Sequence, residues 1–423
     1  MDFIDELEWR GMLHDSTPGI RDLLSKGMST GYIGFDPTAP SLTIGNYVQL
    51  MILSFWQRSG HRPIFLLGGA TGRIGDPSGK DKERQLKTGD ELDRNLAFQK
   101  AQAERFLNFT DGPNKALMIN NYDFYESMNV LDFLRDVGKN LTVNYMMSKD
   151  SVKNRLDSGL SFTEFSYQLL QAYDYLCLYR KHDCKIQMGG SDQWGNITSG
   201  TEFIRRNVEG GKAYAITTPL LTRADGKKFG KSEEGNIWLD PKLTSPYKFY
   251  QFWINADDAD LPKFFRYFSF KSREEIENLE SSGDPRSMKK MLAEELTRRI
   301  HSDDDFQAVS DVSEILFDKK ASAEKLRSLT QMSLDTIAQE IPCFKIQGDI
   351  IKNQIDISSL LADHTSICSS KGDVRRAVQN NALSINKVKV SDTGLLVSSE
   401  DLLHGKHIMV ENGKKNKYLI EIY

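Results

Sequence analysis

The chain has 423 residues, of which 39% are apolar and 27% charged, a balance typical of soluble globular proteins. No stretch approaches the run of about 18 consecutive apolar residues that a membrane-spanning helix needs, so we expect no membrane association. The four cysteines show no CxxC spacing, and the first eight residues are acidic, unlike a signal or transit peptide. We therefore expect a cytoplasmic protein without a zinc ribbon or a disulfide framework. Because the net charge is −4, a polyanion would have to bind local basic patches.

The first half of the chain has the pattern of alternating strands and helices. A short strand is expected at 30–35, a helix at 46–58 and a buried parallel strand at 63–68. Later strands of the same sheet are expected at 116–119 and 185–188. We therefore predict a doubly wound α/β domain with a parallel, Rossmann-like sheet over residues 1–222. Ligands of such sheets bind at the carboxyl ends of the strands. The GxGxxG, Walker A and HExxH patterns are absent, which disfavours a dinucleotide, P-loop or zinc-protease site.

The rest of the chain divides into three segments. Residues 223–335 begin with a loop rich in glycine and lysine and continue with a charged, helical pattern. Periodicity weakens over 336–354, which predicts a linker. Residues 355–423 combine a capped helix at 370–378 with two short strands around Asn386-Lys387, which predict a tight hairpin in a small α+β domain.

Two loops have the composition of phosphate-binding sites. The first, residues 34–46, joins a strand to a helix N-terminus, where free N–H groups and the helix dipole favour an anion. Thr38 and Thr43 supply hydroxyl groups there, and Gly45 permits close approach of the backbone. The second is Lys228-Phe229-Gly230-Lys231-Ser232, in which two lysines flank a glycine. Alone, the first loop could equally be an ordinary strand-to-helix connection and the second a solvated basic turn, but their order along the chain strengthens both.

Together the two loops resemble the HIGH and KMSKS signatures of class I aminoacyl-tRNA synthetases. Longer runs resemble the bacterial-type tyrosyl-tRNA synthetases, and the resemblance covers essentially the whole chain. These runs lie at residues 32–38, 68–77, 120–123 and 189–196. The chain departs from the family pattern at the first signature, because Thr43 and Asn46 replace its two histidines. The second signature has Phe229-Gly230 at its centre, a variation that the family tolerates.

The helix expected at 161–178 carries polar residues on an otherwise apolar surface. Tyr167, Gln171 and Asp174 share one face because they are four and three residues apart. A carboxylate buried among apolar residues needs a partner. A phenolic ligand could donate to Asp174 and bond Tyr32, although an internal structural network would also satisfy these groups. Phenylalanine would leave both unpaired.

The resemblance implies a two-step reaction, in which tyrosine is activated by ATP and then transferred to the terminal adenosine of tRNA(Tyr). It implies catalytic roles on the pyrophosphate side for Thr38, Thr43, Lys228 and Lys231. It implies tyrosine binding by Tyr32, Asp76, Asn121, Tyr167, Gln171, Asp174 and Gln193. It implies ATP binding by Asp36, Gly45, Asn46, Asp192, Lys231 and Ser232. Lys80 and Arg84 could add positive charge or lie in a solvated loop. Mg²⁺ is expected to accompany ATP as part of the substrate, with no metal site of protein ligands and no tightly bound cofactor.

Residues 355–423 resemble an S4-type RNA-binding domain, and the helical segment an anticodon-binding domain. The candidate RNA-binding residues are Lys371, Arg375, Arg376, Lys387 and Lys389, with Lys414, Lys415 and Lys417 adjoining them. The resemblance also implies a homodimer, for which the apolar positions of 130–147 are candidates, and no DNA partner. Two alternatives remain open from the sequence: a tryptophanyl-type synthetase, and a non-catalytic RNA-binding protein derived from a synthetase.

Overall fold

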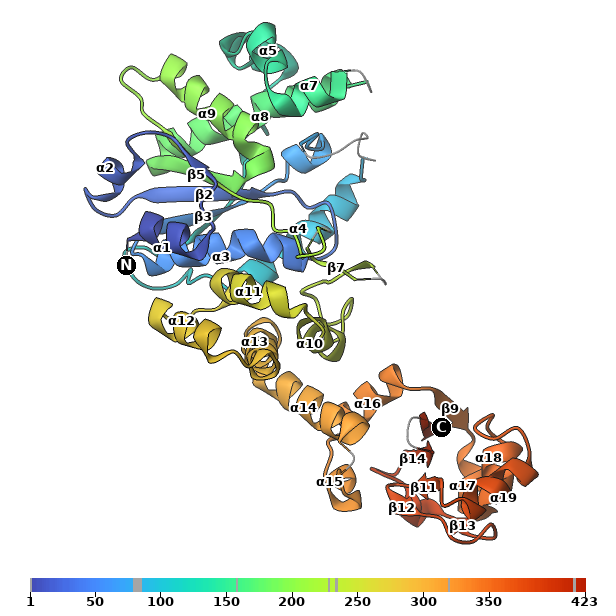
Figure 1. Ribbon diagram of the computed structural model, residues 1–423. Helices are drawn as coiled ribbons and strands as arrows, with labels where there is room; N and C mark the ends of the chain where they lie inside the picture. The colour runs from blue at the N-terminus through green and yellow to red at the C-terminus, as the bar shows by residue number, and fades with distance from the viewer. Residues whose placement is uncertain are drawn as a thin grey trace. The chain divides into compact units, whose positions relative to one another are not determined.

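Two units make up the computed structural model, which describes residues 2–78, 86–156, 159–226, 229–232, 235–318, 320–413 and 416–423. The first comprises residues 1–245 and 251–296, and the second comprises 246–250 and 297–423. Figure 1 shows the first unit in blue to yellow and most of the second in orange to red.

The first unit is built on a six-stranded sheet. Its strand order is β1-β6-β5-β2-β3-β4, and every pairing is parallel except that of β1 with β6. The strands are β1 (Asp15–Ser16), β2 (Thr30–Phe35), β3 (Arg62–Leu67), β4 (Leu117–Asn120), β5 (Cys184–Gly190) and β6 (Tyr214–Thr218). The predicted strands are confirmed to within a few residues. Because the chain proceeds from β2 toward β3 on one side and from β5 toward β6 on the other, the order reverses between β2 and β5. A doubly wound sheet binds its ligands at that point.

Helices cover both faces of this sheet. α3 (Ile44–Arg58) lies on one face, and α8 (Phe162–His182) and α9 (Trp194–Asn207) lie on the other (Figure 1). α3 buries residues around its whole circumference in its middle turns, as expected for a helix between a sheet and a further helical layer. The doubly wound α/β prediction is therefore confirmed.

The other helices of the first unit are mostly short. They are α1 (Phe3–Arg10), α2 (Ile20–Leu24), α4 (Gly89–Ala103), α5 (Val130–Asp136), α6 (Val143–Met147), α7 (Asp150–Leu156), α11 (Leu261–Phe268) and α12 (Arg273–Ser282). Two further helices, α10 (Pro246–Ile254) and α13 (Pro285–Ile300), contribute residues to both units.

The second unit joins helices to a small sheet. The helices are α14 (Asp303–Phe317), α15 (Ala323–Arg327), α16 (Gln331–Glu340), α17 (Gly348–Lys352), α18 (Ile357–Ala362) and α19 (Lys371–Gln379). The five-stranded sheet has the order β12-β11-β14-β15-β9. Its strands are β9 (Cys343–Ile346), β11 (Leu383–Ile385), β12 (Val388–Lys389), β14 (His407–Asn412) and β15 (Asn416–Ile422), and β10 (Ile355–Asp356) pairs separately with β13 (Leu396–Val397). Asn386 and Lys387 both have positive φ, at 45° and 65°, so the predicted tight hairpin is confirmed.

The expected linker at 336–354 is instead regular structure. It contains the end of α16, then β9, which pairs in parallel with β15, and then α17. One apolar cluster joins Val312 and Ile337 of the helices to Met409 and Leu419 of the sheet. The sequence pattern weakened there because three short elements follow one another, each too short to show a period. The helical part and the small sheet therefore form one folded unit.

In the part of the chain that the structure describes, no helix combines the length and apolar character needed to cross a membrane.

Candidate active site

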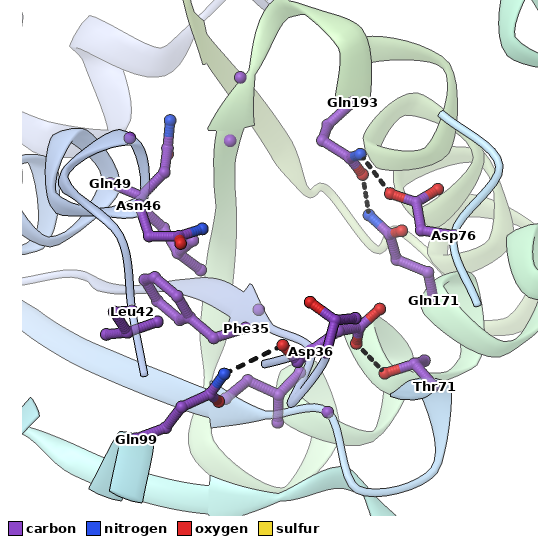
Figure 2. A pocket seen from close by; sticks show the side chains of 18 of the residues that line it. Phe35, Asp36, Leu42, Asn46, Gln49, Thr71, Asp76, Gln99, Gln171 and Gln193 are labelled. Atoms are coloured by element: carbon purple, nitrogen blue, oxygen red, sulfur yellow. Dashed lines mark hydrogen bonds between the residues drawn. The ribbon is translucent and has the colours of Figure 1, made fainter. Parts of the chain in front are cut away.

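A cavity of about 650 Å³ opens at the carboxyl ends of β2 and β5, where the strand order reverses. Its lining comes from the end of β2, the loop 36–43, the start of α3, α8 and the turn η4 (Ser191–Gln193). Most of the residues predicted for catalysis, tyrosine binding and ATP binding line it: Tyr32, Asp36, Thr38, Thr43, Gly45, Asn46, Asp76, Asn121, Tyr167, Gln171, Asp174, Asp192 and Gln193. Figure 2 shows the loop 36–43 and α3 facing Gln171, Gln193 and Asp76 across the open space.

The floor of the cavity is a buried carboxylate. Asp174 is 2% exposed and accepts hydrogen bonds from the Asn121 amide at 2.8 Å and from the Tyr125 hydroxyl at 2.7 Å. Burial raises the pKa of Asp174 to about 7, although the bonds from Asn121 and Tyr125 oppose the rise. The Tyr32 hydroxyl is buried nearby and has no hydrogen-bond partner among the described residues. Burial, and then the charge of Asp174, raise the pKa of Tyr32. The floor therefore holds one acceptor and one neutral hydroxyl that still needs a partner.

Two further carboxylates lie on the wall beside α8. Gln193 donates to Asp76 at 2.6 Å, and Gln171 donates to Gln193 at 3.5 Å (Figure 2). Tyr167 donates to Asp36 at 2.8 Å, and burial raises the pKa of this hydroxyl. Amide oxygens and carboxylates together form a site that suits an ammonium group.

The loop 36–43 is held by α4. Gln99 donates to the carbonyl of Asp36 at 3.0 Å (Figure 2), and Asn95 donates to the carbonyl of Pro37 at 2.9 Å. Thr71 donates to the Asp36 carboxylate at 2.6 Å. Gln99, Asn95 and Thr71 therefore hold the two residues directly before Thr38, a role that the sequence pattern did not predict.

Thr43 and Asn46 form a capping box at the start of α3. The Thr43 hydroxyl donates to Asn46 Oδ1 at 2.8 Å, the Thr43 backbone N–H donates to the same oxygen at 3.0 Å, and the Asn46 backbone N–H donates to Thr43 Oγ1 at 3.3 Å. The Thr43 proton is thus directed at Asn46 rather than at the cavity. These bonds use the oxygen of the Asn46 amide and leave its NH₂ group as the donor for a ligand.

The second signature loop packs against this helix start. Ile44 donates its backbone N–H to Ile237, and Ile237 donates to the carbonyl of Gly230. Gly230 has φ +85°, and a Cβ there would lie 2.9 Å from Ile44 Cγ2 and 3.2 Å from the Gly45 nitrogen. Only glycine fits this approach. The two signatures therefore meet through their backbones.

The described part of the second signature comprises Phe229, Gly230 and the backbone of Lys231 and Ser232. Lys228 lies outside the described residues, as do Lys80 and Arg84, and Lys231 and Ser232 are described by their backbone, which forms β7 and pairs with β8 (Gly235–Asn236). Phe229 is buried, with its ring centroid 5.2 Å from that of Phe264 and 5.4 Å from that of Phe268. An aromatic cluster therefore anchors the loop at its second residue.

The candidate RNA-binding lysines and arginines fall into two groups. Lys371, Arg375, Arg376 and Lys389 are exposed, and Lys371 pairs with Asp363 at 2.9 Å while Arg376 pairs with Asp373. The side chain of Lys387 is only 8% exposed and donates to Glu411 at 2.9 Å and to the carbonyl of Ile315 at 3.0 Å. The hairpin turn directs Lys387 into the protein, which the local count of positive charges could not reveal. Lys414 and Lys415 lie outside the described residues.

Comparison with known proteins covers nearly all of the chain. Residues 25–318 match the family model of the class I tRNA synthetases for tryptophan and tyrosine, and residues 333–420 match that of the C-terminal domain of tyrosine–tRNA ligases. The chain is 50% identical to the tyrosine–tRNA ligase of Bacteroides fragilis and 51% identical to that of Porphyromonas gingivalis, over 99% of each chain.

Solved structures agree in fold. A C-terminally truncated mitochondrial tyrosyl-tRNA synthetase of Aspergillus nidulans aligns with a TM-score of 0.66 and 32% identity, over 74% of this chain and 94% of its own. The corresponding protein of Coccidioides posadasii aligns with a TM-score of 0.64 and 29% identity, over 73% and 91%.

Proposed function

The chain belongs to the tyrosine–tRNA ligases, a family of class I aminoacyl-tRNA synthetases, and from this premise we propose how its pocket divides the reaction. The enzyme activates L-tyrosine with ATP and then charges tRNA(Tyr). In the first step a carboxylate oxygen of tyrosine bonds to the α-phosphorus of ATP while the bond to the bridging oxygen breaks, and pyrophosphate leaves. In the second, the terminal adenosine hydroxyl of the tRNA attacks the acyl carbon and AMP leaves.

The observation that carries the tyrosine assignment is the pair of groups at the pocket floor. A phenol donates its proton to Asp174 and accepts one from the Tyr32 hydroxyl, which satisfies both. An indole N–H can only donate, so tryptophan would leave Tyr32 unpaired, and phenylalanine would leave both groups unpaired. Asn121, which also lines the cavity, donates to Asp174.

The ammonium group of tyrosine binds at the wall of α8. Asp76, Gln171 and Gln193 present oxygen atoms there, and Tyr167 adds a hydroxyl that is held by Asp36. Binding at both ends fixes the carboxylate of tyrosine toward the open side of the cavity, where the ATP phosphates must approach. Positioning of this kind can supply much of the rate enhancement.

ATP binds between the start of α3 and the second signature loop. Gly45 lies at the positive end of the α3 dipole and lines the cavity, Asn46 offers its NH₂ group, and Thr38 belongs to the same lining. Lys228, Lys231 and Ser232 belong to the second signature loop, whose Gly230 packs closely against Gly45 at the start of α3. We assign the two lysines to the pyrophosphate, because their positive charge suits that group. Asp192 lines the opposite wall and suits the ribose. Mg²⁺ arrives as part of the substrate, bound by the phosphates of ATP.

Transfer RNA binds the helical region and the small C-terminal domain. Arg375, Arg376, Lys371 and Lys389 form an exposed basic surface that suits phosphates. We assign Lys387 to internal packing instead, because Glu411 and the end of α14 take its donors.

The enzyme acts in the cytoplasm as a homodimer. Support for the dimer comes from large apolar side chains that stand exposed on α5, α6 and the start of α8, namely Val130 (70%), Leu131 (74%), Leu134 (50%), Val143 (60%), Met147 (38%) and Phe162 (74%). A surface of this kind marks an interface. Sedimentation of Leu131→Asp should show monomers where the parent protein shows dimers, and an unchanged dimer would place the interface elsewhere.

Two assays test the function. The first measures ATP–pyrophosphate exchange with tyrosine, tryptophan and phenylalanine, and the second measures charging of tRNA. We expect exchange with tyrosine alone and charging of tRNA(Tyr). Exchange with tryptophan at a comparable rate would refute the assignment of the pocket floor. No exchange with any of the three would indicate the non-catalytic alternative.

A further inference from the structure

Tyr125 lies beneath the pocket floor and does not line the cavity. It caps the turn η2 (Asn121–Phe124), which follows β4 directly. Its ring packs against Tyr173, with centroids 5.6 Å apart, and against Phe133 at 6.5 Å. Its hydroxyl lies 2.7 Å from Asp174 Oδ1 and 2.9 Å from the carbonyl of Leu170. Among the described residues, this turn and its cap therefore supply the two side-chain donors to Asp174, from Asn121 and from Tyr125.

The two donors divide the carboxylate between them. Tyr125 bonds Oδ1 and Asn121 bonds Oδ2. Each carboxylate oxygen can accept two bonds, so each keeps one lone pair for the ligand. With both oxygens held, the carboxylate cannot rotate about its χ2 angle without breaking a bond. Its orientation toward the phenol is therefore set by Asn121, which lines the cavity, and by Tyr125, which does not.

The hydrogen bonds from Asn121 and Tyr125 are the main contacts that lower the pKa of Asp174. Burial raises its pKa to about 7, and the charge of Asp36 adds to that rise, whereas Asn121 and Tyr125 oppose it. Tyr32, Tyr167 and Cys177 also face this region, and burial raises the pKa of each, so they stay neutral near pH 7. Near neutral pH the fraction of ionised Asp174 thus depends on two hydrogen bonds.

We propose that Tyr125 is a positioning residue for substrate selection, whose hydroxyl keeps Asp174 ionised and oriented to accept the phenolic proton of tyrosine. This inference rests on the proposed role of Asp174. A purely structural role for the hydroxyl is the poorer explanation, because the Leu170 carbonyl lies within α8 and has a helical partner of its own. Replacement by phenylalanine leaves the ring packing in place and removes the bonds to Asp174 and to the Leu170 carbonyl, of which only the carbonyl keeps its helical partner.

Tyr125→Phe tests the proposal, with Tyr122→Phe as the matched control from the same turn. Tyr122 is 40% exposed, and its ring contacts Arg73 rather than Asp174. We would measure kcat/KM for tyrosine from pH 6 to pH 9 by pyrophosphate exchange, because this ratio reports the ionisation of the free enzyme.

For Tyr125→Phe we expect the acidic midpoint of the profile to move up by about one pH unit, the scale of one lost hydrogen bond to a charged group. On that basis kcat/KM at pH 6 should fall about tenfold and at pH 9 less than twofold. The preference for tyrosine over phenylalanine should fall, while kcat at saturating tyrosine and KM for ATP stay unchanged. Tyr122→Phe should match the parent enzyme throughout.

An unmoved midpoint together with unchanged selectivity would refute the role of Tyr125. So would a loss that is equal at every pH and extends to KM for ATP, because that pattern indicates general disruption. Asp174→Asn, assayed in parallel, separates this failure from that of the proposed function. If Asp174→Asn keeps normal exchange, the assignment of the pocket floor is wrong; if it loses exchange while Tyr125→Phe is normal, only the role of Tyr125 fails.

Discussion

Asp174→Asn should stabilise the empty protein at alkaline pH and abolish tyrosine activation. Burial raises the pKa of the Asp174 carboxyl from 3.8 to about 7, so the folded protein holds this proton more tightly than the unfolded chain does. The resulting stabilisation is complete below about pH 4 and is lost as the pH rises through about 7. Asparagine does not ionise, so the variant avoids that loss.

The size of the effect follows from the shift. One pKa unit corresponds to about 1.36 kcal/mol, and the parent loses stability over about two pH units, from pH 5 to its folded pKa of about 7. The free energy of unfolding of the variant, relative to that of the parent, should therefore be about 2–3 kcal/mol higher at pH 8 than at pH 5. Asparagine also fits the contacts. Its oxygen can accept from Asn121, and its NH₂ can donate to Tyr125, whose proton still has the Leu170 carbonyl.

Urea unfolding, monitored by tryptophan fluorescence at pH 5, 6, 7 and 8, measures the difference in free energy of unfolding between Asp174→Asn and the parent. All five tryptophans, at positions 9, 56, 194, 238 and 253, belong to the first unit, which contains the pocket, so their signal reports that unit. Asp123→Asn, an exposed carboxyl in the adjacent turn, is the control and should show no such gain. A gap between Asp174→Asn and the parent that is the same at pH 5 and pH 8 would refute the reasoning about the buried carboxylate.

Three further predictions concern the signatures and the second unit. Thr43→Val and Asn46→Ala should each raise KM for ATP in pyrophosphate exchange. Because the two side chains bond each other, the double variant should resemble Asn46→Ala, which corresponds to a coupling energy of about 1 kcal/mol. Additive losses would mean that Thr43 binds phosphate directly. Gly230→Ala should impair exchange through KM for ATP, whereas Gly226→Ala, which has φ +77° and open space around it, should cost less; equal losses would exclude the contact with α3 as the cause. Lys417→Met removes bonds to the carbonyls at the end of α14, so calorimetry should show the second unit destabilised by about 1.5–3 kcal/mol. Charging of tRNA should fall while pyrophosphate exchange stays unchanged. A parallel loss of exchange would argue against a role confined to that unit.

The sequence predicted best those features that depend on neighbours along the chain. Buried strands are continuous apolar runs, and Tyr167, Gln171 and Asp174 share a face because α8 fixes their spacing. Such patterns are local, so they need no knowledge of the fold.

Features that depend on distant contacts were missed. Tyr125 lies two residues beyond the run at 120–123 that the resemblance singled out, and its role arises from a contact with a residue 49 positions away. Lys387 counted as surface charge until the hairpin placed it against Glu411 and α14. The segment 336–354 has no clear sequence period because its strand, β9, is defined by its pairing with β15, which lies far along the chain.

The capping box at the start of α3 has an evolutionary consequence. Among the described residues, the Thr43 and Asn46 side chains form a side-chain hydrogen bond only with each other. A change at either position therefore leaves the other without its partner and also weakens the helix start. The two positions should therefore have changed together. Among relatives of this enzyme, threonine at the first position should occur with asparagine at the second more often than chance allows, and mixed pairs should be rare.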